Sequence, residues 1–375
     1  AGDNVEQAGR RLRLQFFRRL IADGRFHKIA VGHTRTDQAE TVLFRFLRGA
    51  GTAGLAGIHP VLDKTIVRPL IEVERGEVLE YLRAHGRSWR EDSSNRSLDL
   101  ARNRLRHELV PQLARDWNRE ITRTLAQTAE WAREEEEYWK ARMEELGPRY
   151  LRVEGPIVYL EAPATAGLPA AVERRLLRHA LEKVRGDLRG IDFGHIEQIR
   201  GVTAQQEGHG RTQVPGVDVF RSFDQVRLAP PGVQGGLENR NFSVALVIPG
   251  TYDIPHTQKR LRLELKEASG GDQGYNEESA RLDWERVPYP VWLRNWRPGD
   301  RYQPVGWSGP EKLKTLFQLR RVPLWERRHW PVVASEGQVV WMRGFGAASA
   351  LVAGPDTRTV LEITECPCLP PRSGV

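Results

Sequence analysis

The stretch from Lys28 to Leu47 constrains the fold more than any other part of the sequence. Lys28 to His33 form a short, mainly apolar run that predicts a buried strand. The apolar side chains that follow recur at intervals of three and four residues, which predicts an amphipathic helix capped by Thr36 or Asp37. These apolar positions are Ala39, Val42, Leu43, Phe46 and Leu47. Such alternation of strand, loop and helix predicts an α/β domain with a parallel sheet.

Two breaks divide the rest of the chain. Gly147-Pro148 ends a long predicted helix that starts at Pro111, and a Pro- and Gly-rich linker covers residues 230–236. Helices are predicted near 170–184 and 193–201, and alternating stretches such as 260–265 predict strands beyond the linker. The expected segments are an α/β domain at 1–110, a connecting helix at 111–147, a middle mixed domain at 148–230, an α+β C-terminal domain at 237–365 and a tail at 366–375.

The composition excludes several classes of protein. Of the 375 residues, 39% are apolar and 28% are charged, which is ordinary for a globular protein. No apolar run reaches the roughly 18 residues of a membrane span, so we expect no membrane segment and a cytoplasmic location. Cys366 and Cys368 are the only cysteines and lie in the tail, so a disulfide framework is excluded and no metal site is predicted.

The charge distribution indicates a polyanionic partner. The chain has 57 basic and 49 acidic residues, a net charge of +8. From Arg294 to Trp330 the sequence has nine Arg or Lys against three Asp or Glu. Aromatic residues are interleaved with these cations: Trp296, Tyr302, Trp307, Phe317, Trp325 and Trp330. Cations with aromatics suit phosphate contacts and base stacking, and a solvated basic face over a tryptophan-rich core explains the pattern equally well.

Polar residues gather where the first predicted strand gives way to its helix. His33 stands at the strand end, and Asp37, Gln38 and Glu40 lie in the first helical turn. Open α/β sheets bind ligands at the carboxyl ends of their strands, and a helix N-terminus offers free N–H groups to anions. A histidine there can bond a phosphate or a nucleotide edge, and carboxylates can hold an ammonium group. A capping aspartate beside a surface histidine is the simpler alternative.

A glycine-rich loop and an arginine pair follow. Four glycines between Gly49 and Gly57 allow close backbone approach to a ligand, and Arg48 can supply charge. Farther along, Arg102 and Arg106 are four residues apart and share one helix face, which suits phosphate binding. An ordinary loop and a solvated basic helix are the alternatives for these two features.

Taken together and in this order, these segments resemble tRNA(Ile)-lysidine synthetases, a family of PP-loop ATPases. The most specific pieces are His33-x-x-x-Asp37-Gln38-x-Glu40-Thr41 and the glycine loop from Arg48 to Ile58. The other matching pieces are Arg68-Pro69-Leu70, Arg75 with Tyr81, Asp92-x-x-Asn95, Arg102-Asn103-x-x-Arg106, Arg297-Pro298-Gly299-Asp300-Arg301, Lys312-Leu313-Lys314 and Val322-Pro323 with Arg327-Arg328. The likeness spans nearly the whole chain.

The resemblance implies a fold and a reaction. The fold is a partial adenine-nucleotide alpha-hydrolase-like (PP-loop) domain with a parallel sheet, then a mixed substrate domain and an α+β C-terminal domain. The enzyme is a ligase that uses ATP, accompanied by Mg²⁺, to adenylate the C2 oxygen of the wobble cytidine in a tRNA(Ile) with a CAU anticodon. The amine of free L-lysine then displaces AMP and leaves lysidine. Whether the enzyme is a homodimer is left open.

The resemblance also implies roles for individual residues. Asp37, Glu40 and Arg102 are the expected catalytic residues, the two carboxylates holding the ammonium groups of lysine. The expected nucleotide-binding residues are His33, Gln38, Arg48, Gly49, Gly51, Gly54, Leu55 and Arg106. The expected RNA-binding residues are Arg297, Arg301, Lys312, Lys314, Arg321, Arg327 and Arg328.

One family motif does not occur in the chain. PP-loop ATPases carry Ser-Gly-Gly-x-Asp-Ser after their first strand, and the string Ser269-Gly270-Gly271 has the wrong continuation and place. The resemblance therefore predicts an N-terminally truncated enzyme that forms no lysidine by itself. Two alternatives are a non-catalytic tRNA-binding remnant and another PP-loop tRNA-modifying enzyme, such as a 2-thiocytidine enzyme. The latter relies on cysteine pairs, and the cysteines here lie in the tail.

Overall fold

The computed structural model describes residues 5–90, 101–205, 208–233, 241–255, 257, 259–268 and 279–367. The chain forms two compact units, Ala1–Arg149 and Tyr150–Val375, and each is described by itself. The motif Asp92-x-x-Asn95, the string 269–274 and Cys368 lie outside the described residues. No helix in the described part of the chain is both long enough and apolar enough to cross a membrane.

The first unit opens with a small mixed sheet and its helices. In chain order its elements are α1 (Val5–Ala22), β1 (Ile29–Ala30), α2 (Arg35–Leu47), α3 (Thr52–Leu55), β2 (Val61–Leu62), β3 (Ile66–Val67) and α4 (Arg75–Ala84). The strand order is β1-β3-β2, with β1 parallel to β3. Strand β2 is antiparallel to β3, because Asp63 and Lys64 both have positive φ and form a tight hairpin turn. Ala39 and Val42 of α2 are buried, so the predicted amphipathic helix is confirmed.

The start of α2 differs from the predicted one. Thr34 is the N-cap, and its side-chain oxygen accepts a hydrogen bond from the backbone N–H of Asp37. In return, Asp37 Oδ2 accepts from the Thr34 N–H at 2.9 Å. This reciprocal capping box needs a hydroxyl residue followed three positions later by an acid, and Thr34 with Asp37 supplies that spacing. The prediction that Thr36 or Asp37 caps the helix is therefore wrong, because both lie inside its first turn.

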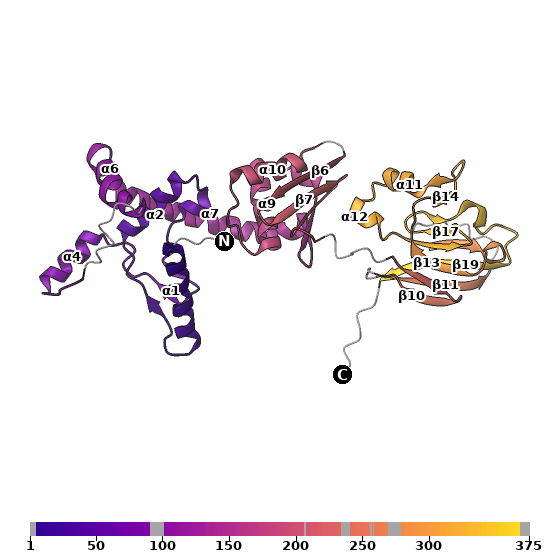
Figure 1. Cartoon of the computed structure of the whole chain (residues 1–375), viewed down its shortest axis with the longest axis horizontal. Helices are drawn as coiled ribbons and strands as arrows, with labels where there is room; N and C mark the ends of the chain where they lie inside the picture. Colours follow the sequence, from indigo (N-terminus) through magenta and orange to yellow (C-terminus); the bar gives the residue numbers. More distant parts are fainter. Residues whose placement is uncertain are drawn as a thin grey trace. The chain divides into compact units, whose positions relative to one another are not determined.

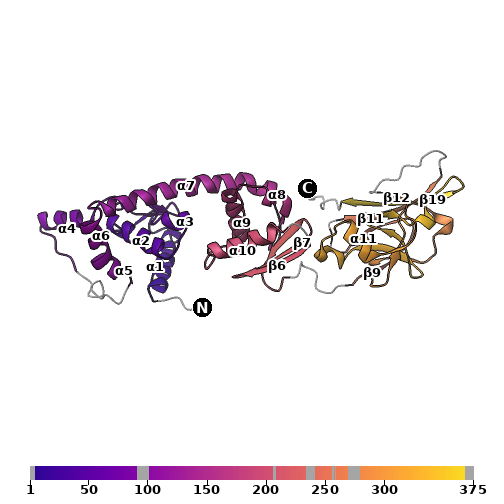
Figure 2. The ribbon, with the colours of Figure 1, turned by 90° about the horizontal axis from the view of Figure 1, so that it is seen from above.

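The helices that close the first unit are α5 (Ala101–Arg104), the π-helical turn η2 (Leu105–Leu109), α6 (Val110–Asp116) and α7 (Ile121–Tyr150). The single long helix predicted from Pro111 is thus two helices. They separate at Asn118, whose side chain bonds the Glu120 N–H and the Thr124 hydroxyl and so competes with the helical backbone. Helix α7 also continues past Pro148, contrary to prediction, and is drawn as one long helix in Figure 2.

The second unit begins with an antiparallel sheet covered by helices. Its elements are β4 (Leu151–Glu154), β5 (Ile157–Glu161), α8 (Ala162–Ala166), α9 (Ala170–Arg185), α10 (Phe193–Thr203), β6 (His209–Val214), β7 (Val217–Ser222) and β8 (Gln225–Ala229). The strand order is β4-β5-β8-β7-β6. Helices α9 and α10 pack on this sheet (Figure 1), and Leu176, Leu177 and Leu181 of α9 are fully buried. The helices predicted near 170–184 and 193–201 are confirmed.

Two further antiparallel sheets share one core in the same unit. The first has the order β10-β11-β19-β12 and the second β18-β17-β16-β13-β9. Their strands are β9 (Ser243–Leu246), β10 (Gly250–Asp253), β11 (Lys259–Glu267), β12 (Ser279–Asp283), β13 (Val291–Asn295), β16 (Pro331–Ser335), β17 (Gln338–Met342), β18 (Gly346–Ala347) and β19 (Thr359–Pro367). Leu263 and Ile363 of one sheet and Leu293 and Val332 of the other belong to one buried cluster.

Short elements complete this part of the chain. They are η3 (Trp284–Arg286), the strand pair β14 (Arg301–Tyr302) and β15 (Glu311–Lys312), α11 (Leu313–Leu319), α12 (Leu324–Arg327) and η4 (Ser349–Leu351). Leu313, Leu316 and Phe317 of α11 join the buried cluster. The basic stretch of the sequence therefore lies on elements that are anchored in the core.

Candidate functional site

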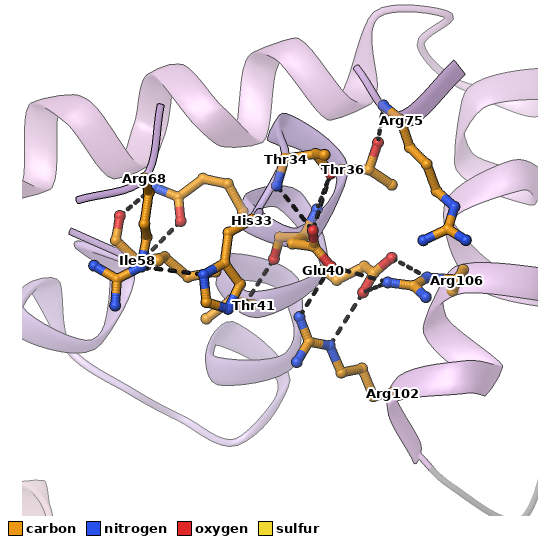
Figure 3. A network of polar contacts seen from close by, with 12 residues as sticks. His33, Thr34, Thr36, Glu40, Thr41, Ile58, Arg68, Arg75, Arg102 and Arg106 are labelled. Carbon is orange, nitrogen blue, oxygen red and sulfur yellow. Dashed lines mark hydrogen bonds and ion pairs between the residues drawn. The ribbon is translucent and has the colours of Figure 1, made fainter. Parts of the chain in front are cut away.

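Polar side chains meet where β1 ends and α2 begins. Arg68, which follows β3, donates from Nε to His33 Nδ1 at 3.1 Å and also to the carbonyl oxygen of His59. An arginine is always a donor, so His33 must accept with Nδ1, and its proton sits on Nε2. Figure 3 shows His33 and Arg68 facing each other. The parallel pairing of β1 with β3 places both residues at the same edge of the sheet.

A second cluster joins the first turns of α2 to α5 and η2. Glu40 Oε1 accepts from Arg106 Nε at 2.5 Å, and Glu40 Oε2 accepts from Arg102 Nε at 3.1 Å and Arg106 Nη2 at 2.9 Å. Asp37 Oδ1 accepts from Arg106 Nη2 at 3.0 Å and Arg102 Nη2 at 3.4 Å. Figure 3 shows both arginines turned toward Glu40. Two carboxylates and two guanidinium groups form a network without net charge.

Burial differs across this carboxylate–arginine network. The side chain of Glu40 is 1% exposed, that of Arg106 16% and that of Arg102 36%. Burial by itself would raise the pKa of Asp37, but hydrogen bonds from Thr34 and the charges of the two arginines bring that pKa below its usual value of 3.8. Burial opposes the charge of Arg106, and the bonds and charges of Glu40 and Asp37 raise its pKa in spite of it. These two pKa shifts keep Asp37 and Arg106 ionised at neutral pH.

The glycine loop is held by two side chains of α2. Arg45 Nη1 donates to the carbonyl oxygens of Gly54 at 2.9 Å and Gly57 at 3.0 Å. Gln38 Oε1 accepts from the Ile58 N–H at 2.5 Å, and Gln38 Nε2 donates to the Ile58 carbonyl at 3.2 Å. Gln38 is 2% exposed, so its amide is engaged with the loop. The short helix α3 forms within this loop.

Other predicted residues around the loop have simpler environments. Arg48 is exposed, with its guanidinium carbon 4.7 Å from the ring centroid of Phe44. Gly49 has φ +75°, and Gly51 is the N-cap of α3. Gly54 and Leu55 lie in α3 and are half-buried. The structure thus brings Asp37, Glu40, Arg102 and Arg106 together, and it places the loop residues on the neighbouring segment after α2.

Three residues of this region were not predicted to act in the site. Thr34 caps α2 and binds Asp37, Arg45 holds the glycine loop, and Arg68 bonds His33. For Thr34 the spacing to Asp37 was available as a capping-box signal. Arg68 belongs to the family-like piece Arg68-Pro69-Leu70, but that piece was given no role in the site. Arg45 gave no signal of its own, because its partners are backbone carbonyls that only the folded chain brings near.

The predicted RNA-binding residues are mostly on the surface of the second unit. Exposed side chains are Arg297, Arg301, Lys312, Lys314, Arg321 and Arg328. Arg321 forms a two-bond ion pair with Asp224, both bonds at 2.8 Å. Arg327 corrects the prediction: it is 6% exposed, donates from Nε to the Val322 carbonyl at 2.8 Å, and lies over the rings of Phe223 and Phe317. The Arg327 guanidinium is therefore buried in the folded chain, whereas the prediction required an exposed cation.

Most aromatic residues of the basic stretch belong to the core. Phe317 makes edge-to-face contacts with Trp296 and Trp330, at centroid distances of 5.3 and 5.7 Å. Tyr302 is buried and donates its hydroxyl to Gly346. For these residues the interpretation as a tryptophan-rich core is confirmed. Trp307 is 39% exposed.

Comparison with known proteins identifies the class and then the family. A family profile described as the PP-loop domain matches residues 1–113, which agrees with the sheet edge and helix start that build the site. The first part of the chain is thus a PP-loop domain. Profiles described as the TilS substrate binding domain and the TilS substrate C-terminal domain match residues 160–227 and 291–363.

Individual relatives agree with these profiles. The tRNA(Ile)-lysidine synthase of Solibacter usitatus is 50% identical over 366 residues, which cover 96% of this chain and 82% of the relative. That of Symbiobacterium thermophilum is 32% identical over 380 residues, covering 96% and 77%. The chain belongs to the tRNA(Ile)-lysidine synthase family. A solved structure described as the TILS C-terminal domain is 22% identical, covers 35% of this chain and all of that one, and has a TM-score of 0.32, which adds nothing to this assignment.

Proposed function

We propose that the chain takes part in lysidine formation on an isoleucine tRNA with a CAU anticodon. ATP adenylates the C2 oxygen of the wobble cytidine and releases pyrophosphate, and the amine of lysine then displaces AMP. The observation that carries this proposal is the carboxylate–arginine network at the edge of the PP-loop sheet. One site there offers both signs of charge, as a reaction between an anionic nucleotide and a cationic amino acid requires.

The network suits an exchange of partners. Every oxygen of Asp37 and Glu40 already accepts at least one hydrogen bond and Glu40 is 1% exposed, so we expect an arginine to move away when an ammonium group binds. When a phosphate arrives with the lysine, Arg102 and Arg106 can turn to the phosphate while the carboxylates turn to the ammonium group. Each charge keeps a partner of opposite sign throughout, so neither substrate leaves a charge buried alone. Binding of the two substrates should therefore be mutually favourable.

The neighbouring residues complete the nucleotide site in this proposal. His33 lies at the same edge of the sheet as Arg68, where its ring can contact a phosphate or a base edge. Gly49, Gly51 and Gly54 let the backbone approach the nucleotide, and Gln38 and Arg45 hold that loop in place. Arg48 and Leu55 lie on the same segment and line the approach to it.

A resident Mg²⁺ site does not fit the side chains in view. Within residues 5–90, 101–205 and the later described ranges, no group of three or more His, Cys, Asp or Glu side chains can hold a metal ion. Asp37 and Glu40 are committed to arginines. Mg²⁺ usually keeps several waters and binds substrate phosphates with one or two carboxylates. We propose that Mg²⁺ enters with the phosphates of ATP.

The reaction is tested by nucleoside mass spectrometry of the tRNA. Because the 375 residues contain no Ser-Gly-Gly-x-Asp-Ser sequence, the assay compares them alone and fused behind a PP-loop segment that carries this sequence. We expect lysidine from the fusion with ATP and lysine, and none from the 375 residues alone. A fusion that binds tRNA but forms no lysidine would favour the alternative of a non-catalytic tRNA-binding protein.

In the active fusion, Asp37→Asn is expected to raise the KM for lysine by about tenfold or more and the KM for ATP by less than threefold, because one lost charge contact is worth about 1.4 kcal/mol or more. The lowered pKa of Asp37 keeps it ionised above about pH 4. The ratio of the KM for lysine in the variant to that in the unchanged fusion should therefore be the same at pH 6.5 and pH 8.5. Asp63→Asn, which removes an exposed ion pair with Arg18, is the matched control. A larger rise for ATP than for lysine would reverse the assignment.

We also propose that exposed cations of the second unit bind the tRNA. Each phosphate contact steepens the fall of affinity with salt by about 0.9 in log–log slope on duplex RNA or DNA. Lys312→Ala with Lys314→Ala should therefore lower the slope by up to about 1.8 and weaken binding at low salt. Lys266→Ala, on a lysine paired with Glu362, should leave the slope unchanged. An unchanged slope in the double variant would place tRNA recognition elsewhere.

A further inference from the structure

A cleft of about 520 Å³ lies in the second unit, and its lining includes no residue of the PP-loop site. Strands β6, β7 and β8, the turn after β8, and helix α12 with the residues after it form its walls. Its lining residues are Arg211, Asp218, Phe220, Arg227, Gly232, Val233, Leu324, Trp325, Arg328 and His329. The size is within the range of about 300–1,000 Å³ that small-molecule pockets have.

Specific contacts hold α12 against the strands. The Leu324 N–H donates to Ser222 Oγ at 3.1 Å, and the ion pair of Arg321 with Asp224 lies one turn before it. Trp325 packs beside Tyr159 and Phe220, at centroid distances of 6.0 and 6.1 Å. The cleft is therefore built by anchored groups, with an aromatic wall at Trp325 and Phe220.

The polar atoms in the walls of the cleft indicate what kind of ligand it can bind. Asp218 Oδ1, Arg227 Nε and Trp325 Nε1 are buried and have no hydrogen-bond partner among the described residues. Buried donors and acceptors normally have partners, so these walls favour a polar occupant over an apolar one. The set contains both donors and an acceptor, as the edge of a nucleobase requires, whereas a simple anion would leave the carboxylate unpaired.

Two further cations stand at the surface of the same cleft. Arg211 and Arg328 are exposed, and neither pairs with a carboxylate in the part of the chain that the structure describes. A guanidinium group binds a phosphate through two parallel hydrogen bonds. The cleft thus combines aromatic rings, hydrogen-bonding groups for a base edge, and two cations for a phosphate.

We propose that this cleft binds one unpaired nucleotide of an RNA strand, with its base in the aromatic wall beside Trp325 and its phosphate at Arg211 and Arg328. Paired bases cannot enter, because their edges and faces are already occupied in the duplex. The inference rests on the proposed function, since the tRNA substrate would supply the unpaired nucleotide. It adds a site for single-stranded RNA to the surface cations that hold the tRNA backbone.

The test uses the whole 375-residue chain and a trinucleotide with 2-aminopurine at its centre, whose fluorescence falls when the base stacks. We expect saturable quenching. Arg211→Ala with Arg328→Ala should weaken binding by about tenfold or more and lower the salt slope by up to about 0.7, since the two arginines hold one phosphate and each single-strand phosphate contact adds about 0.7. Arg189→Ala removes an exposed arginine of the same unit outside the cleft and should change nothing.

The tryptophan variants separate stacking from packing. Trp325→Phe keeps an aromatic ring and should keep most of the quenching, while Trp325→Leu should lose it with an unchanged circular dichroism spectrum. If Trp325→Leu does not fold, the double variant of Arg211 and Arg328 still tests the proposal, because both side chains are exposed and their removal should leave the fold intact. Absence of saturable binding, or an equal loss for Arg189→Ala, would overturn the proposal.

Two further ligands identify the source of the nucleotide. For a blunt RNA duplex the arginine double variant should lose much less affinity than it loses for the trinucleotide; an equal loss for duplex and trinucleotide would show a general basic surface and overturn the site. AMP that competes with the trinucleotide and binds as tightly would assign the same cleft to a free nucleotide. Lysidine formation is measured separately, so its failure beside intact trinucleotide binding would count against the proposed function alone.

Discussion

Glu40→Gln is expected to lower the free energy of unfolding of the first unit by about 2–3 kcal/mol. Removing one partner of a buried ion pair costs about 3–5 kcal/mol, and the partial exposure of Arg102 and Arg106 reduces that figure. The loss is large because Glu40 is the acceptor for both arginines. It is measured by urea unfolding at pH 7, followed by the fluorescence of the tryptophans.

The control for this variant is Glu108→Gln, which makes the same chemical change at an exposed position on η2 and should cost less than about 0.5 kcal/mol. A double variant with Arg106→Gln should cost clearly less than the sum of the two single variants, because each single variant already breaks the same pair. Equal costs for Glu40→Gln and Glu108→Gln would show that the network contributes nothing to stability.

Gly57→Ala is expected to cost about 3 kcal/mol and to remove nucleotide binding. Its φ of +63° disfavours any side chain by about 1 kcal/mol, and a Cβ there would lie 2.6 Å from Gln38 Oε1. The collision breaks the buried bonds between Gln38 and Ile58, which adds about 1–3 kcal/mol. Thermal unfolding and nucleotide titration measure the two effects.

Substitutions at two other glycines separate the strain of a positive φ from the collision with Gln38. Gly49→Ala has a similar φ of +75° but meets nothing within 4 Å, so it should cost only about 1 kcal/mol. Gly51→Ala meets nothing and has an ordinary negative φ, so it should be close to neutral. Equal losses at all three positions would mean that loop flexibility, rather than the contact with Gln38, determines stability here.

The sequence predicted elements better than it predicted their ends. The apolar period of α2 and the alternation of β11 were sufficient to predict a helix and a strand, because each pattern of side chains follows from the burial of one face of the element. The break at Asn118 and the continuation past Pro148 were missed, since both depend on which backbone groups find partners in the folded chain.

The site was predicted as separate parts. Asp37 with Glu40 and Arg102 with Arg106 each gave a signal from their spacing along a helix, but nothing in the sequence showed that the two pairs meet. The contacts cross more than 60 positions along the chain, and they follow from the packing of η2 against α2. Arg327 shows the opposite error: a basic residue in a basic stretch was taken for a surface cation, while the fold buries it over two phenylalanine rings.

The shared carboxylate of Asp37 limits which amino acids the position can accept. Oδ2 fixes the first turn of α2 through Thr34, and Oδ1 holds the two arginines. Asparagine keeps one oxygen but presents an amide to the other side, and glutamate moves both oxygens outward by one carbon. Asparagine can therefore keep the bond to Thr34 while it loses the ion pairs with the arginines, whereas glutamate shifts both at once. Asp37 thus couples the start of α2 to the charge network, and asparagine is the substitution that separates the two.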